Sequence, residues 1–114
     1  MVKTDKNQQR LKDINEAIDN VSIFIQNKSF EDLNADLILK SAIMAQLMIM
    51  GEAAKHLNED FKIANNQIDW NKIIGLRNIL IHEYFGIEWE IVWDTIKEDI
   101  PKLKKDLAKL LDPD

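Results

Sequence analysis

The sequence predicts an all-α fold, because its apolar residues recur mainly three and four positions apart along nearly the whole chain. Only three glycines and two prolines occur in 114 residues, so there are few points at which helices must break. With 46% hydrophobic residues, a chain of this length can bury one core without metals or disulfides. We therefore predict a single domain over residues 1–114, folded as an antiparallel bundle of four to five helices.

The first helix is expected to begin after Thr4 or Asp5 and to be amphipathic. Its apolar residues form a single stripe, made of Leu11, Ile14, Ile18, Val21 and Ile25. Ser29 and Asp32 then have the spacing of a capping box, which indicates a short turn of helix before the next long one.

The second long helix is expected to start at Asn34 or Asp36 and to end near His56 or Leu57. It is apolar nearly all round, since the polar residues between positions 37 and 50 are Lys40, Ser41 and Gln46. In a small domain one set of neighbouring helices rarely covers such a helix, so we expect part of it to contact a second copy of the chain in a homodimer. The alternative is a central helix that its own chain covers completely.

The second half of the chain is expected to open with a polar loop over residues 58–67. Asp69 then caps a third helix that begins at Trp70 and ends near His82 or Glu83. After Gly86 a fourth helix is expected over residues 88–99, and Pro101 either opens a fifth helix or kinks one long helix.

Composition narrows the possible functions. The chain has no cysteine, which excludes disulfides and a cysteine nucleophile, and we expect a cytoplasmic protein. The first six residues lack the apolar run of a signal peptide, and no stretch approaches the ~20 uncharged residues of a membrane span, so no membrane is expected. A net charge of -5 argues against general electrostatic attraction to nucleic acid, so any contact with RNA must be local.

The predicted third helix has one polar edge. Asn71, Gly75, Asn78 and His82 follow one another at spacings of four, three and four residues, which places them along one side. Gly75 would let another backbone or a substrate come close to this edge. A role at the helix C-terminus or at the surface remains the alternative for His82, and no spacing around it completes a metal site.

Arg77 falls instead on the apolar arc of the same helix, where an ideal helix would bury it. A buried charge is costly unless it is paired, so a structural ion pair is the simplest interpretation. The best partner is Glu52, because it too interrupts an apolar run, over residues 48–54.

The residues from Arg77 to Tyr84 have the pattern R-x4-H-x-Y, and this segment resembles the HepT-like branch of the HEPN superfamily. The segment Gly51-Glu52-Ala53 is similar to the glycine-glutamate-alanine segment of that family, and residues 93–103 are similar to its closing helices. The resemblance covers nearly the whole chain and implies a HEPN-like fold.

The resemblance also implies a function. Members of this family are toxins of toxin–antitoxin pairs, and they cleave RNA without a metal or other cofactor, as homodimers in which both copies of the motif line one cleft. Arg77 and His82 would be the catalytic pair, with Asn78 and Glu52 as supporting residues. Tyr84 matches the tyrosine that a partner nucleotidyltransferase of the MNT type modifies with AMP to silence the toxin. Assembly beyond the dimer stays open.

The residue types suit metal-free RNA cleavage, which needs a base, an acid and positive charge at the phosphorus. One histidine cannot easily serve as both base and acid, so a two-fold dimer would supply a second His82. Two other functions stay open: a non-catalytic helical dimer that docks or regulates a nucleotidyltransferase, and a generic helical dimer in which Arg77 is paired and buried and His82 faces outward.

Overall fold

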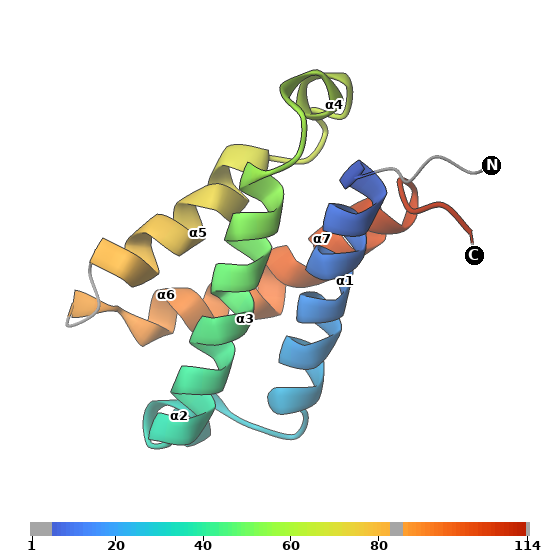
Figure 1. Cartoon of the computed structure of the whole chain (residues 1–114). Coiled ribbons are helices and arrows are strands. Elements are labelled where there is room, and N and C mark those ends of the chain that lie inside the picture. Colours follow the sequence, from blue (N-terminus) through green and yellow to red (C-terminus); the bar gives the residue numbers. More distant parts are fainter. Residues whose placement is uncertain (1–5, 83–85, 114) are drawn as a thin grey trace.

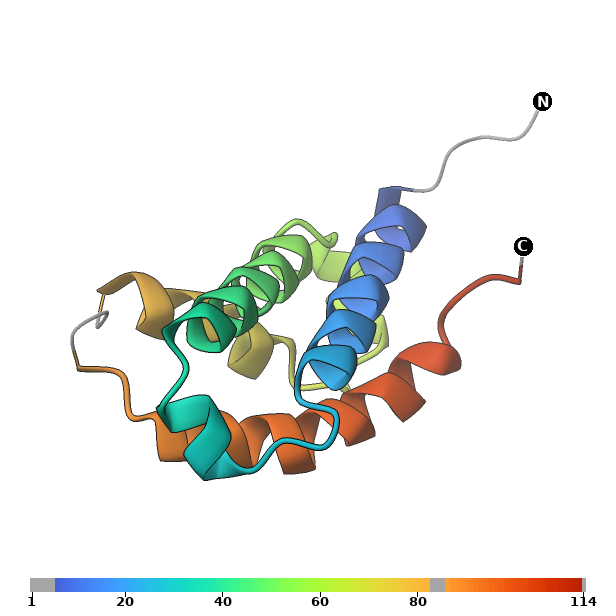
Figure 2. The same ribbon diagram turned by 90° about the horizontal axis from the view of Figure 1, so that it is seen from below.

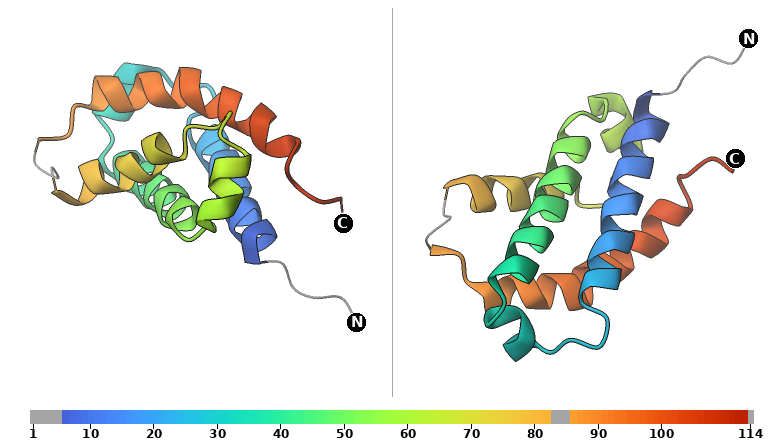
Figure 3. Two further views of the ribbon diagram at one scale, coloured as in Figure 1. Left: turned by 90° about the horizontal axis from the view of Figure 1, so that it is seen from above. Right: turned by 60° about the horizontal axis from the view of Figure 1, so that its bottom comes forward.

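The computed structural model describes residues 6–82 and 86–113, with the backbone alone at 79, 81 and 82. The all-α prediction is confirmed, since helices make up most of these residues and none of them lies in a strand. Two layers are visible (Figures 1 and 3): α5 (Trp70–His82), α3 (Leu37–Lys55) and α1 (Lys6–Phe24) lie side by side in the first. A long C-terminal arm, residues 89–108, crosses them as the second layer (Figure 2).

The N-terminal helices form largely as their sequence predicts, although α1 ends at Phe24, so Ile25 of the predicted stripe lies just after the helix. Leu11, Ile14, Ile18 and Val21 of α1 are buried in the core shared with α3, which runs antiparallel to α1 (Figure 1). The capping box is present at α2 (Phe30–Asn34), where the Asp32 backbone N–H donates to the Ser29 hydroxyl and the Ser29 N–H donates to the Asp32 carboxylate. The Asp36 carboxylate caps α3 by accepting a hydrogen bond from the Leu39 N–H.

Helix α3 lies between α1 and α5, yet part of it stays exposed. Its length and composition alone would let it cross a membrane, but its inner face, including Ile43, Leu47 and Met50, is fully buried in the protein core. On the outer face Leu37 and Ile38 are 72% and 82% exposed, and Ile49 is 44% exposed. The alternative of a helix that its own chain covers completely is therefore wrong.

The prediction of a loop over residues 58–67 is partly wrong, because Glu59–Ala64 form the short helix α4. Its six residues are too few to show an apolar period. Glu59 and Asp60 lie in its first turn, where negative charge favours a helix start. Phe61 contacts Trp70, with ring centroids 6.2 Å apart, and so ties α4 to the start of α5.

The C-terminal arm is continuous through α6 (Trp89–Asp94), the π-helical turn η2 (Thr95–Asp99) and α7 (Ile100–Ala108). Of the two options predicted at Pro101, one long distorted helix is the correct one. In the π turn the Ile100 N–H donates to the Thr95 carbonyl, five residues back. Because proline lacks an N–H and its ring crowds the preceding turn, the wider turn lets the helix pass Pro101 without ending.

Candidate active site

The site begins where α3 and α5 are in close contact at Gly51. Gly51 is buried, and a Cβ atom built on it would lie 2.6 Å from the Arg77 Cβ and 3.2 Å from the Ile73 carbonyl oxygen. No side chain fits at that spacing, so Gly51 is required here for space and not for backbone conformation. Because Gly51 has no side chain, the backbone of α5 can lie against α3. Arg77 is thereby placed beside Glu52, the residue that follows Gly51.

Glu52 and Arg77 form the predicted ion pair. The Arg77 Nε lies 2.7 Å from the Glu52 Oε2. The two side chains are 27% and 47% exposed, so the expectation of a buried Arg77 is wrong. The guanidinium group of Arg77 is therefore only partly covered by the protein. A pair so exposed contributes little to stability.

His56 forms a cluster with Arg77 and Glu52. It was not predicted from the sequence as a site residue. Its Nε2 lies 3.0 Å from the Glu52 Oε1. The hydrogen bond from His56 holds the pKa of Glu52 below its ordinary value; partial desolvation acts against this, and the Arg77 charge adds to it. Glu52 therefore stays ionised through neutral and mildly acidic pH. The i,i+4 spacing of Glu52 and His56 was the available sequence signal.

Asn78 lies next to Arg77 on the exposed polar edge of α5. Its Oδ1 accepts a hydrogen bond from the Arg77 Nη1 at 3.3 Å, so the predicted supporting residue does contact the predicted catalytic arginine. His82 is the last residue of α5, four positions after Asn78, and an ideal helix places these two positions on the same edge. The His82 side chain and all of Tyr84 lie outside the described residues, so their predicted roles stay predictions.

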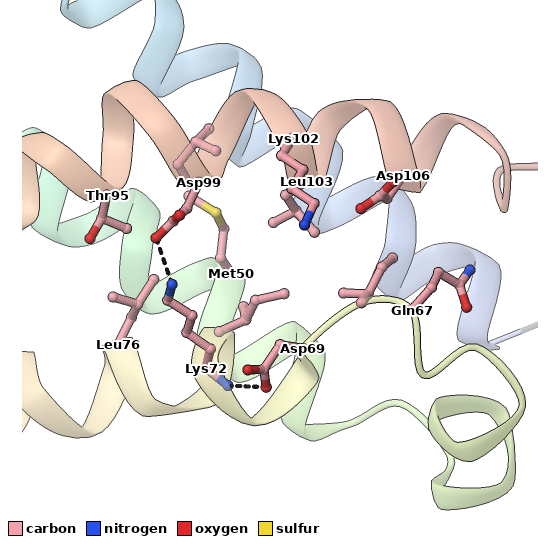
Figure 4. Close-up of a pocket in the computed structure, with 13 residues that line it drawn as sticks. Met50, Gln67, Asp69, Lys72, Leu76, Thr95, Asp99, Lys102, Leu103 and Asp106 are labelled. Carbon is pink, nitrogen blue, oxygen red and sulfur yellow. Dashed lines mark hydrogen bonds and ion pairs between the residues drawn. The ribbon is translucent and has the colours of Figure 1, made fainter.

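A cleft of about 260 Å³ lies between α5 and the C-terminal arm (Figure 4). Its walls include Met50, Ile73 and Leu103, and Arg77 is not among its lining residues. Lys72 and Asp99 form an ion pair of 2.8 Å across it, and the hydrogen bond with Asp99 raises the pKa of Lys72. The cleft is therefore separate from the Arg77 cluster, and the ion pair links α5 to the arm.

Among the side chains that the structure describes, which do not include that of His82, no group of three or more from histidine, aspartate and glutamate is placed to hold a metal ion. The cluster formed by Arg77, Glu52, His56 and Asn78 instead offers a charged guanidinium group that two neighbours hold and that remains partly exposed. Such a group can bind a phosphate through its terminal nitrogens.

Comparison with known proteins gives the family. The family described as Ribonuclease HepT-like matches residues 14–110. A protein of Thermococcus cleftensis named probable ribonuclease HepT is 41% identical over 100 residues, which cover 88% of this chain and 91% of that protein. A candidate RNase of Methanocaldococcus jannaschii, MJ1380, is 37% identical over 97 residues, covering 85% and 89% of the two chains. No solved structure gives a significant match. The chain therefore belongs to the ribonuclease HepT-like family of the HEPN superfamily.

Proposed function

We propose that this chain is a metal-independent endoribonuclease that acts as a homodimer and is the toxin of a toxin–antitoxin pair. The observation that carries the proposal is the placement of Arg77: Gly51 and Glu52 hold it from the α3 side, while its guanidinium group remains partly exposed. The names of the relatives support an activity on RNA. These names state no reaction mechanism, no partner and no means of regulation.

The proposed reaction is attack of a ribose 2′-hydroxyl on the adjacent phosphorus. His82 of one subunit takes the 2′-hydroxyl proton, the new O–P bond forms, and the 5′-oxygen leaves with a proton from His82 of the other subunit. Arg77 stabilises the negative charge of the phosphorane by binding two of its oxygens. The products are a 2′,3′-cyclic phosphate and a 5′-hydroxyl end, and no step needs a metal.

The exposed face of α3 supports the homodimer. Ile38, Ala45 and Ile49 follow one another along this face at spacings of seven and four residues, and all are exposed. Glu52 comes three residues later on the same face and contacts Arg77. A second copy that covered this apolar stripe would bring its own α5 near the first, and would gather two copies of Arg77 in an otherwise acidic protein.

Incubation of the purified chain with total RNA and a chelator tests the proposed function. The wild-type chain is expected to cleave RNA in excess chelator and to leave 2′,3′-cyclic phosphate ends, because histidine and arginine supply all the catalytic groups. RNA fragments are resolved on denaturing gels and their ends are identified by mass spectrometry. Cleavage that stops in chelator and returns with a divalent ion would contradict metal independence, and intact RNA in both conditions would favour the non-catalytic dimer.

Silencing is proposed to occur at Tyr84. The phenolic oxygen bonds to the α-phosphorus of ATP, pyrophosphate leaves, and a partner nucleotidyltransferase catalyses the transfer. The added phosphate is negative, so it repels the RNA backbone and competes for Arg77.

Tyr84→Phe lacks the acceptor oxygen and is expected to keep its RNA cleavage when the partner and ATP are present, whereas the wild-type chain loses it. Cleavage rates are measured before and after incubation with the partner, and AMP transfer is followed by intact mass. Omitting ATP provides the control. A Tyr84→Phe chain that is silenced as completely as the wild type would refute the role of Tyr84.

A further inference from the structure

The two oxygens of the Glu52 carboxylate bind two different partners. Oε2 lies 2.7 Å from the Arg77 Nε, and Oε1 lies 3.0 Å from the His56 Nε2. The His56 and Glu52 side chains are 58% and 47% exposed, so this arrangement contributes little to stability. The contact with His56 instead fixes the orientation of the Glu52 carboxylate, and through Glu52 it affects how Arg77 is held.

An arginine and a carboxylate that meet without competition commonly pair through two nitrogens and two oxygens. That geometry would use one terminal nitrogen of Arg77, which is a nitrogen that a phosphate also needs. Here His56 holds one of the carboxylate oxygens, and the ion pair with Arg77 joins the other oxygen to Nε. The terminal Nη1 donates instead to the neutral amide oxygen of Asn78, at the longer distance of 3.3 Å. A charged phosphate oxygen can displace this neutral acceptor.

We propose that His56 is a positioning residue of the nuclease site: by holding the Glu52 Oε1, it confines Glu52 to the Nε edge of Arg77 and leaves the terminal nitrogens to the RNA phosphate. This inference rests on the proposed function. Without a donor at position 56, Oε1 is released and Glu52 turns to take a second nitrogen of Arg77. The phosphate then has to displace a carboxylate before Arg77 can stabilise the reacting phosphorus.

Two variants of similar size separate this role from a structural one. His56→Gln keeps an N–H donor for Oε1, whereas His56→Leu has none. His56→Leu is expected to lower kcat about tenfold, the size of one hydrogen bond to a charged group. KM is expected to stay within about twofold, because the stabilisation that is lost is that of the phosphorane and not that of the bound RNA. His56→Gln is expected to restore most of kcat, and both variants are expected to unfold at nearly the wild-type temperature.

A double variant tests whether His56 acts through Glu52. In a Glu52→Gln background His56→Leu is expected to cause no further loss of kcat, because the charge that His56 restrains is already gone. An equal loss in both backgrounds would overturn the inference, as would wild-type kcat in His56→Leu alone.

A second readout does not depend on RNA cleavage. The chain has two arginines, Arg10 and Arg77, so a ¹⁵N spectrum of the arginine side chains contains two Nε–H signals, which Arg10→Lys assigns. The Arg77 signal is expected to move in His56→Leu but not in His56→Gln, and to respond less to added inorganic phosphate in His56→Leu.

These two readouts keep the inference apart from the proposed function. A wild-type chain that leaves RNA intact would refute the nuclease, and the Arg77 signal would still decide whether His56 controls the ion pair. Identical Arg77 signals and phosphate responses in wild type and His56→Leu would overturn the inference even if the wild type cleaves RNA.

Discussion

His82→Ala is expected to lower kcat for RNA cleavage by a factor of about 10² to 10⁴, because the proposed reaction loses both its proton acceptor and its proton donor. Arg77→Ala is expected to lower kcat by a similar factor, since no other described side chain of the cluster brings positive charge that persists at every working pH. Both are measured with a fluorescent RNA in chelator, and circular dichroism checks that the helices persist. Full cleavage by either purified variant would reject the catalytic assignment.

Mixed dimers test whether the two copies of His82 share one reaction. When wild-type and His82→Ala chains are refolded together, a mixed dimer contains one His82, lacks either the base or the acid, and is expected to be nearly inactive. Activity should then fall with the square of the wild-type fraction. A linear fall would show that each subunit cleaves RNA alone, and would contradict the composite site.

Gly51→Ala is expected to destabilise the fold and to displace Arg77. The new Cβ would lie 2.6 Å from the Arg77 Cβ, close to the backbone of α5, so α5 has to move. Overpacking of this kind costs about 1–3 kcal/mol. The better helix propensity of alanine offsets up to about 1 kcal/mol of that loss. Urea denaturation measures the difference, and kcat for RNA cleavage is expected to fall with the shift of α5.

Gly75→Ala is the matched control, because it makes the same chemical change within α5. A Cβ on Gly75 meets no described atom within 4 Å, so this substitution is expected to stabilise the chain by about 0.5–1 kcal/mol. Equal effects of the two substitutions on the unfolding free energy would show that the contact between Gly51 and α5 has no energetic consequence.

Much of the fold follows from local rules that the sequence displays. The capping box at Ser29, the cap at Asp36 and the apolar stripe of α1 all depend on spacings of three and four residues, and the structure confirms each of them. Helix α4 was not predicted, because a helix of six residues is too short to show a regular spacing of apolar residues. The π turn was not predicted either, because the sequence shows Pro101 but not how the preceding turn widens.

Part of the candidate site was also predictable from local patterns in the sequence. Two interruptions of apolar runs, Glu52 and Arg77, indicated an ion pair between helices, and the structure confirms it. The exposure of Arg77 was not predictable, because it depends on which sides of α5 other helices cover. The role of Gly51 was also hidden, since a glycine within a helix shows its purpose only when the neighbouring backbone is placed.

One helix, α3, carries both the exposed apolar stripe and the carboxylate that orients Arg77. If the stripe joins two subunits as proposed, formation of the enzyme is a bimolecular event. At concentrations where monomers predominate, cleavage would rise with the square of the amount of chain present. A cell with few copies would be spared and one with many would be harmed, so the abundance of the protein would itself set a threshold for toxicity.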